Sequence, residues 1–202
     1  ITGIDIGTNF VKAVIVDTRE RNEKGLPKAI GAGMAESRGL RHGYVTNVRD
    51  VAESVRKATA AAEEKAGVKV KKAFVAVGGI GLSSTVVSSS IVTSRADAEI
   101  TALDIEKLKE QSEKDLPHFA KANRRVIYDI PLEYKIDGES SLGSPFGLTG
   151  NKIEKKTLFI TCLEHHVADL IAAVNEAGIE VEDIMAAPIA AGFVTLNKTQ
   201  KI

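Results

Sequence analysis

Residues 5–12 read Asp-Ile-Gly-Thr-Asn-Phe-Val-Lys, and this stretch decides the interpretation of the fold. Aliphatic residues alternate through residues 1–6, and a second aliphatic run follows over residues 12–17. The pattern predicts two strands joined by a tight turn at residues 7–9. A P-loop needs a helix directly after its glycine loop, together with Gly-Lys-Ser/Thr spacing, so this stretch is not a P-loop.

A turn of this composition can nevertheless bind phosphate. Gly7 lets an anion approach the backbone, and consecutive amides with the Thr8 hydroxyl supply hydrogen-bond donors. Asp5 can hold Mg²⁺ through water, because Mg²⁺ usually keeps several of its waters, and Lys12 can reach a β- or γ-phosphate. An ordinary hairpin with a glycine turn explains the same residues equally well. The candidate nucleotide-binding residues are Asp5, Gly7, Thr8, Asn9, Phe10 and Lys12, and no residue is assigned a catalytic role.

The rest of the N-terminal region predicts a further strand, a helix and a strand. The charged segment 18–28 predicts a solvated loop because it holds turn residues, and residues 29–36 predict a third strand. Apolar residues recur every three or four positions from Val48 to Ala66, which indicates a helix that Asn47 caps and Gly67 ends. A strand over residues 72–77 follows, so the order is β-β-β-α-β.

The middle of the chain predicts a small inserted domain of the order strand, helix, strand, strand. The helix begins at a capping box, with Ile100 and Ile105 placed as a hydrophobic staple, and it stops before Pro117. The Gly-rich segment 78–81 is interpreted as the hinge into the insert, and residues 137–151 as a loop. The strand candidates are residues 84–92, 124–136 and 152–162.

The C-terminal region returns to an α/β pattern, with a helix over residues 166–177, a strand over 179–187 and a helix from residue 190. Three other features are interpreted as structural. Cys162 is expected to be a small buried hydrophobic residue. The pair His165 and His166 is expected to be a solvated helix start without a metal, and Arg38, Arg41 and His42 a solvated turn.

Composition excludes several classes of protein. The chain has 202 residues, with 27 Lys+Arg against 27 Asp+Glu, so it lacks the basic excess of a dedicated nucleic-acid binder. It has no apolar run of about 18 residues that would span a membrane, and its start lacks the basic region of a signal peptide. A single cysteine excludes a disulfide framework. The chain begins with Ile1 where an initiator Met would stand, which predicts a piece of a longer protein.

The β-β-β-α-β start, the Asp-Ile-Gly-Thr turn and the insert together resemble the actin-like ATPase superfamily. Within that superfamily the chain resembles the bacterial FtsA cell-division family. The most specific segments are Ser-Arg-Gly-Leu at residues 37–40 and Pro-Phe-Gly-Leu-Thr-Gly at residues 145–150. The blocks that carry the resemblance lie in the family's order at residues 3–17, 37–51, 99–108, 126–138, 144–154 and 157–191.

The resemblance implies an actin-like, ribonuclease H-like α/β fold with a small α+β insert. Residues 1–79 and 163–202 would form the family's subdomain 1A, and residues 80–162 its subdomain 1C, an SHS2 domain. It also implies a cytoplasmic protein that polymerises, with residues 80–162 in its subunit contacts, and that binds ATP and Mg²⁺ in its full-length form. In the family, the protein links FtsZ and other division proteins to the inner face of the membrane at the division site.

The chain departs from the family pattern in what it lacks. The second phosphate motif, the adenosine motif, the FtsZ-binding subdomain and the C-terminal segment that reaches the membrane are absent. The fragment is therefore expected to bind ATP weakly or not at all, and its ATPase activity is left open. Two alternatives are a PilM-like type IV pilus assembly adaptor of the same fold and a sugar or acetate kinase. A kinase needs a catalytic carboxylate facing the phosphates, and no residue here identifies one.

Overall fold

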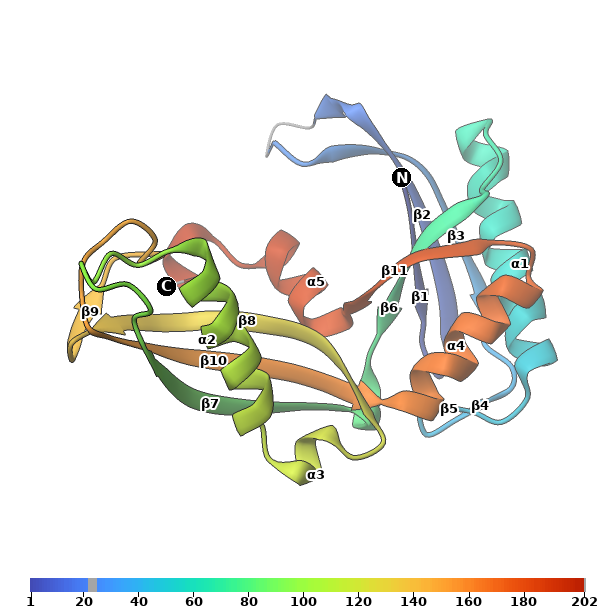
Figure 1. Ribbon diagram of the computed structural model, residues 1–202. Helices are drawn as coiled ribbons and strands as arrows, with labels where there is room; N and C mark the ends of the chain where they lie inside the picture. Colours follow the sequence, from blue (N-terminus) through green and yellow to red (C-terminus); the bar gives the residue numbers. More distant parts are fainter. Residues whose placement is uncertain (22–24, 202) are drawn as a thin grey trace. The chain divides into compact units, whose positions relative to one another are not determined.

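The computed structural model describes residues 1–21 and 25–201, and the chain divides into two compact units (Figure 1). Unit 1 consists of Ile1–Leu82 together with Leu163–Ile202, and unit 2 consists of Ser83–Cys162. The chain therefore leaves unit 1 once, builds unit 2 and returns.

Unit 1 is a five-stranded sheet with helices, and its strand order is β11-β6-β1-β2-β3. Strand β1 is antiparallel to β2 and parallel to β6, and β6 is parallel to β11. Helices α1 and α4 lie side by side, and α5 extends from the end of β11 away from them (Figure 1). The elements are β1 (Thr2–Ile6), β2 (Phe10–Arg21), β3 (Pro27–Glu36), β4 (Leu40–Arg41), β5 (Tyr44–Val45), α1 (Val48–Ala66), β6 (Lys72–Val77), the 3-10 turn Gly79–Gly81, α4 (Glu164–Glu176), β11 (Glu180–Ala186), α5 (Ala187–Thr195) and the 3-10 turn Lys198–Lys201.

The predicted bounds and caps of α1 are confirmed. The side chain of Asn47 accepts hydrogen bonds from the backbone N–H groups of Arg49 and Asp50, at 3.0 and 3.4 Å. Gly67 ends the helix in the left-handed region, at φ 68°, and its N–H donates to the carbonyl of Glu63. Both ends of the helix therefore have partners for backbone groups that the helix itself leaves unpaired.

Helix α1 packs against β3 at two glycines, where it approaches closer than a side chain would allow. A Cβ atom added at Gly33 would lie 2.0 Å from the carbonyl oxygen of Ala58, and one at Gly31 would lie 2.3 Å from that of Ala62. Alanines on the helix face these glycines, so the backbones come close together. The contact lets an aliphatic core form almost without aromatic residues.

We predict that Gly33→Ala destabilises the chain by about 2–3 kcal/mol, because the added methyl group overlaps helix backbone that cannot move alone. Thermal and urea unfolding measure the change. Gly3→Ala is the matched control on β1, since a Cβ atom there meets nothing within 4 Å. The control should change stability by no more than about 0.5 kcal/mol. Equal stability of the two variants would contradict the close packing of α1 on β3.

The prediction of a solvated loop over residues 18–28 is wrong at both of its ends. Strand β2 continues to Arg21 and β3 begins at Pro27, while residues 22–24 lie outside the described residues. The two strands stay paired in this segment, with Asp17 opposite Lys28 and Arg21 opposite Pro27. An ion pair of 2.7 Å between Lys28 and Glu20 joins them. Charged residues here mark the exposed end of a hairpin.

Unit 2 is a four-stranded sheet with helix α2, and its strand order is β7-β10-β8-β9. The capping box at Thr101 and Asp104 is confirmed, and α2 ends at Asp115, before Pro117. A hydrophobic cluster joins the helix to the sheet through Ile100, Leu108 and Ile153. The elements are β7 (Leu82–Val92), α2 (Ala102–Asp115), α3 (His118–Lys121), β8 (Arg124–Ile136), β9 (Glu139–Ser141) and β10 (Lys152–Leu163).

The predicted loop over residues 137–151 contains strand β9. Ile136 pairs with Glu139 across a two-residue turn, in which Asp137 and Gly138 both have positive φ, 49° and 92°. Asp-Gly between paired strands is the composition that such a turn prefers, because both central residues must adopt left-handed backbone. The signal for this hairpin is therefore present in the sequence.

Asp104 is fully buried and accepts four hydrogen bonds at the start of α2. One carboxylate oxygen accepts from the backbone N–H and hydroxyl of Ser94, and the other accepts from the backbone N–H and hydroxyl of Thr101. Burial by itself raises the pKa of this carboxyl, but the hydrogen bonds from Ser94 and Thr101 together lower it well below its usual range. The charged form of Asp104 therefore stabilises unit 2.

We predict that Asp104→Asn destabilises unit 2 by about 2–3 kcal/mol at pH 7. The NH₂ group of the new amide would face N–H and hydroxyl groups of Ser94 or Thr101 that donate to the carboxylate in the native chain. A lowered pKa stabilises the fold above the unfolded value of about 3.9, and this contribution is lost as the pH falls below it. Hydrogen exchange of residues 102–115 at pH 7 and pH 3 measures both effects. Asp115→Asn, at the exposed end of the same helix, is the control. Equal protection in the two variants would contradict this role.

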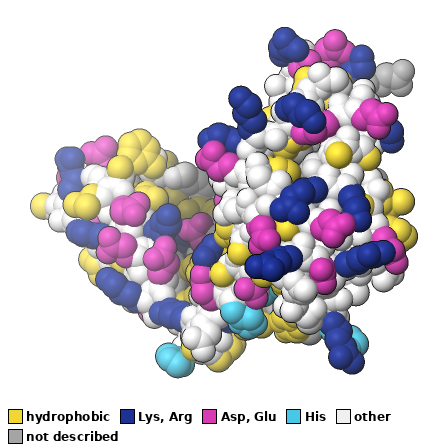
Figure 2. All heavy atoms as spheres, turned by 90° about the vertical axis from the view of Figure 1, so that its right-hand side faces the viewer, with side chains coloured by type: hydrophobic (Ala, Val, Ile, Leu, Met, Phe, Trp, Pro, Cys, Tyr) yellow, Lys and Arg dark blue, Asp and Glu magenta, His cyan; other side chains and the backbone are white. Residues whose placement is uncertain are grey.

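One face of the molecule is mixed in charge. Figure 2 shows Lys and Arg side chains interspersed with Asp and Glu side chains over the visible face. Among the described residues, no helix combines the length and the apolar character needed to cross a membrane.

Candidate functional site

The turn between β1 and β2 contains the candidate residues that were identified in the sequence. The N–H of Gly7 donates to the carbonyl of Phe10 at 3.1 Å, which closes the turn. The N–H of Ser37 donates to the carbonyl of Asn9 at 2.9 Å, so the turn is also joined to the end of β3. Thr8, Asn9 and Phe10 are exposed to solvent. The turn is thus held by backbone hydrogen bonds, while the exposed residues 8–10 remain accessible to a ligand.

Gly7 occupies a tight space in the turn. A Cβ atom at this position would lie 3.1 Å from the carbonyl oxygen of Phe10, tighter than most real contacts of that kind. Gly7 does not have the positive φ that several other glycines of the chain adopt. A larger side chain would push the turn open and would cover the amides, so glycine keeps the backbone open to an anion.

Asp5 and Lys12 face each other across the two strands. They are paired in the β1–β2 register, and Nζ of Lys12 lies 3.4 Å from a carboxylate oxygen of Asp5. Their neighbours Ile4, Ile6 and Val11 are buried, so alternation along each strand places the charged pair on the opposite face of the sheet. Asp5 and Lys12 therefore lie on the face of the sheet opposite the one that carries the buried residues.

Parallel pairing brings two further segments to the same edge of the sheet. Asp5 lies opposite Ala76 and Val77 lies opposite Ala186, so β1, β6 and β11 end together. The residues that follow are Gly7, Gly78 and the start of α5. In open α/β sheets, ligands bind outside the carboxyl ends of the parallel strands.

The start of α5 adds hydrogen-bond donors to this edge. No side chain caps the helix, and Pro188 stands in its first turn. The first N–H groups of a helix have no partner within it, and the helix dipole makes them favour an anion. Strands β11 and β1 are separated by β6 alone, which is two strand spacings or roughly 10 Å. A polyphosphate can span that distance.

Sequence reasoning missed this second part of the site. From the sequence, Gly78 is only part of the hinge into the insert, and Ala187, where α5 begins, is placed at the end of the strand over residues 179–187, with a helix only from residue 190. A Cβ atom at Gly78 would be 3.4 Å from Cβ of Ala187, which is ordinary contact. The available signal was the pair of glycines directly after the apolar strand β6, but the parallel register that gives it meaning is a long-range property.

The expectation of a solvated helix start is wrong for His166. Its side chain is 3% exposed and lies edge-on to the ring of Tyr44, with ring centroids 5.6 Å apart. His165, which is exposed, stacks on the same tyrosine at 6.1 Å. Strand β5 covers the start of α4, and nothing local to the two histidines predicts that contact.

Burial also changes the acid–base properties of His166. Burial, and next the neighbouring His165, lower the pKa of His166, whereas a hydrogen bond to the backbone of Gly78 acts in the opposite direction. His166 is thus a buried residue of unit 1, although its Nδ1 atom has no hydrogen-bond partner among the described residues.

The geometry at Asp5 fits a water-mediated Mg²⁺. Within residues 1–21 and 25–201, no group of three or more His, Cys, Asp or Glu residues could hold a metal ion. A single half-exposed carboxylate suits Mg²⁺, which keeps most of its waters and takes further ligands from substrate phosphates. Asp5 can therefore orient a hydrated ion that a bound nucleotide would bring with it.

The two remaining interpretations are confirmed. Cys162 is fully buried, as a small hydrophobic residue should be. Arg38, Arg41 and His42 are exposed, and His42 and Gly43 form the two-residue turn that joins β4 to β5, with positive φ of 51° and 84°. The three basic residues therefore lie at the surface in and before a hairpin turn.

Comparison with known proteins gives matches over both units. Residues 81–161 match the family model described as the SHS2 domain inserted in FTSA. Cell division protein FtsA of Pseudomonas aeruginosa is 30% identical over 202 residues, which are 100% of this chain and 46% of that protein. FtsA of Streptococcus pneumoniae is 30% identical over 200 residues, covering 99% of this chain and 42% of that protein. The chain thus spans less than half the length of these relatives.

A solved structure agrees with the fold. The PilM-PilN type IV pilus biogenesis complex contains a chain that superposes with a TM-score of 0.63, at 14% sequence identity. The superposition covers 95% of this chain and 48% of that chain. At this identity the similarity shows the fold alone, and that fold agrees with the α/β class that the resemblance implies.

Proposed function

We propose that this chain, whose similarity to FtsA cell-division proteins runs through its whole length, is the N-terminal part of such a protein. The observation that supports this most directly is the continuity of the match. It extends over unit 1 on both sides of the insert, and the insert separately matches the SHS2 domain of FtsA. A shared fold alone does not require sequence similarity in both parts. PilM shares the fold at much lower identity, so the FtsA assignment is better supported.

In this proposal the β1–β2 turn binds the phosphates of ATP. The amides of the turn and the Thr8 hydroxyl donate to phosphate oxygens, and the start of α5 faces the same ligand. Lys12 exchanges its partner Asp5 for a phosphate, and Asp5 then orients the waters of Mg²⁺. Bound Mg²⁺ would neutralise phosphate charge. The other phosphate and adenosine contacts of the full-length protein lie in parts of the relatives that this chain does not match.

Unit 1 then corresponds to subdomain 1A of FtsA and unit 2 to subdomain 1C. The full-length protein would self-associate and would connect FtsZ and later division proteins to the membrane at the division site. Nucleotide acts in this scheme as a conformational ligand, and protein contacts are the output. No residue of the chain is assigned to catalysis.

The test of the proposed function is the position of the fluorescently tagged full-length protein in growing cells. We expect a ring at the division site that forms with FtsZ and disappears when FtsZ is depleted. The tag alone, expressed at the same level, should be diffuse. Foci at the poles or at pilus machinery would overturn the assignment in favour of a PilM-like adaptor, and a diffuse signal would overturn both.

We predict that Gly7→Val in the full-length protein abolishes ATP binding, with at least a hundredfold loss of affinity. The valine side chain would lie against the carbonyl of Phe10 and would cover the amides of the turn. Titration with a fluorescent ATP analogue measures the change. Gly3→Val, on the same hairpin, is the matched control, because a Cβ atom at Gly3 meets nothing within 4 Å. Unchanged affinity in the Gly7 variant would refute the phosphate assignment.

A further inference from the structure

Arg38 is held beside the β1–β2 turn by backbone hydrogen bonds. The preceding residue, Ser37, donates its N–H to the carbonyl of Asn9 at 2.9 Å, which joins the end of β3 to the turn. The N–H of Arg38 itself donates to the hydroxyl of Ser54 on α1, at 3.1 Å. Gly39 follows in the left-handed region, at φ 75°, and its carbonyl accepts hydrogen bonds from the two residues that precede α1. The backbone that carries Arg38 is therefore fixed on both sides.

The side chain of Arg38 is exposed, and its ion pair is weak. Its Nη2 atom lies 3.8 Å from a carboxylate oxygen of Glu36, and the two side chains are 68% and 75% exposed. Glu53 on α1 also attracts Arg38, but Glu53 is paired with Lys57 at 2.7 Å. An exposed pair of this kind contributes little to stability, because water screens it and two long side chains must be ordered. Arg38 can therefore leave Glu36 for a stronger anion.

Strand register places the partner of Arg38 on the same face of the sheet as the charged pair of the candidate site. Glu36 lies opposite Phe10 across β2 and β3, and Phe10 is two residues from Lys12, so these side chains share a face. Asp5 lies opposite Lys12 on that face. Glu36 thus holds the guanidinium of Arg38 at the face on which Asp5 and Lys12 lie.

The turn is flanked by two cations, each of which is paired with a carboxylate. Lys12 lies 3.4 Å from Asp5 on the side of β1, and Arg38 lies 3.8 Å from Glu36 on the side of β3. Neighbouring strands are about 4.8 Å apart, so the hydrogen bond between Ser37 and the turn brings the backbone of Arg38 to about one strand spacing from it. An arginine side chain can span that distance.

We propose that Arg38 is a further phosphate-binding residue of this site, and that it exchanges Glu36 for phosphate oxygens when a nucleotide binds. A guanidinium group presents its N–H donors as a planar fork that forms two parallel hydrogen bonds to phosphate, which a lysine cannot do. Lys12 and Arg38 would then approach the phosphates from the two sides of the turn. Because the phosphate site is itself proposed, this role of Arg38 rests on the proposed function.

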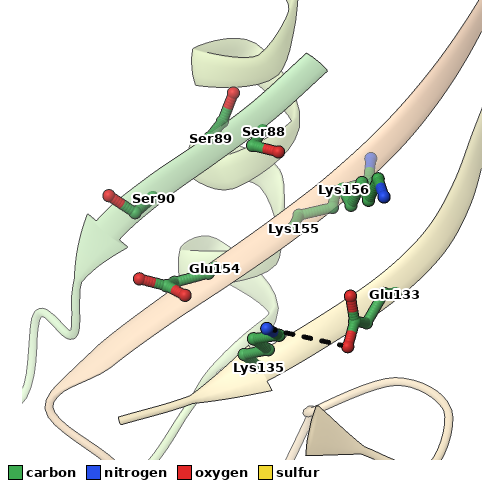
Figure 3. Close-up of a pocket in the computed structure, with 8 residues that line it drawn as sticks. All are labelled: Ser88, Ser89, Ser90, Glu133, Lys135, Glu154, Lys155 and Lys156. Carbon is green, nitrogen blue, oxygen red and sulfur yellow. Dashed lines mark ion pairs between the residues drawn. The ribbon is translucent and has the colours of Figure 1, made fainter. Parts of the chain in front are cut away.

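The charged hollow of unit 2 lacks the backbone donors of such a site. It has a volume of about 360 Å³, and Figure 3 shows that lysines, glutamates and serines line it, with Lys135 paired to Glu133. Its middle strand is β10, which pairs with β7 and β8, and the described residues that line it include no glycine and no helix start. Arg38 differs because it lies beside a turn whose residues 8–10 are exposed.

The experiment measures the affinity of the full-length protein for a fluorescent ATP analogue in the presence of Mg²⁺. We expect Arg38→Ala to weaken binding by about tenfold or more, because a charge-assisted, bidentate contact is lost. Arg19→Ala is the matched control and should leave the affinity unchanged. Arg19 also pairs with the acidic residue two positions before it, Asp17, but it lies toward the far end of β2. Circular dichroism verifies that the variants fold, and Arg38→Gln replaces the first variant if it does not.

Glu36→Gln tests the exchange of partners. The substitution frees Arg38 and removes a negative charge near the phosphates, so the affinity should rise by about two- to threefold. Glu20→Gln is the control, because Glu20 forms an exposed pair with Lys28 toward the far end of the same hairpin. An affinity that is unchanged or lower in Glu36→Gln would overturn the proposal.

The Gly7→Val variant separates this role of Arg38 from the phosphate site as a whole. If Gly7→Val loses ATP binding and Arg38→Ala binds as well as Arg19→Ala, Arg38 does not bind phosphate, and the turn still does. If Gly7→Val and Arg38→Ala both keep the native affinity, the phosphate site itself is wrong, and the role of Arg38 with it.

Discussion

The close contact of α1 with β3 is the constraint on which the rest of unit 1 depends. The helix backbone lies where side chains at Gly31 and Gly33 would be, so the two layers are held together by alanine and glycine. Because the layers are this near, small aliphatic residues such as Val11 and Val55 are fully buried between them. Strand β2 is fixed in this way, and with it the turn that precedes it. The candidate site is therefore held in place from behind, through the core, while its own residues stay exposed.

The sequence predicts those parts of the fold that depend on local signals. The stripe of α1 and its two caps, the capping box of α2 and the strand β6 all have their information within a few residues, and the structure agrees. The hairpin at Asp137 was also a local signal, but the glycine and serine content of its surroundings obscured it. The prediction of a loop there was an error in weighing two local signals, the Asp-Gly turn against the loop-like composition around it.

The other errors come from contacts between distant parts of the chain. Strand β2 continues through charged residues because β3 pairs with it, and the buried state of His166 depends on Tyr44, more than a hundred residues earlier. The same limit applies to the candidate site. Asp5 and Lys12 follow from strand alternation, whereas Gly78 and the start of α5 join them only through the parallel register of β1, β6 and β11. Burial and register of this kind are properties of the folded chain.

The phosphate site and the insert belong to two different sheets, which has a consequence for how the chain could work. Phosphate binding involves the carboxyl edge of the unit 1 sheet, whereas the sheet of unit 2 is built from β7, β10, β8 and β9. The two sheets share no described strand pairing. The chain passes between the two units near residues 82–83 and 162–163, and Gly78 and His166 lie within a few residues of these crossings. If nucleotide controls association, the coupling would be sought first at these crossings.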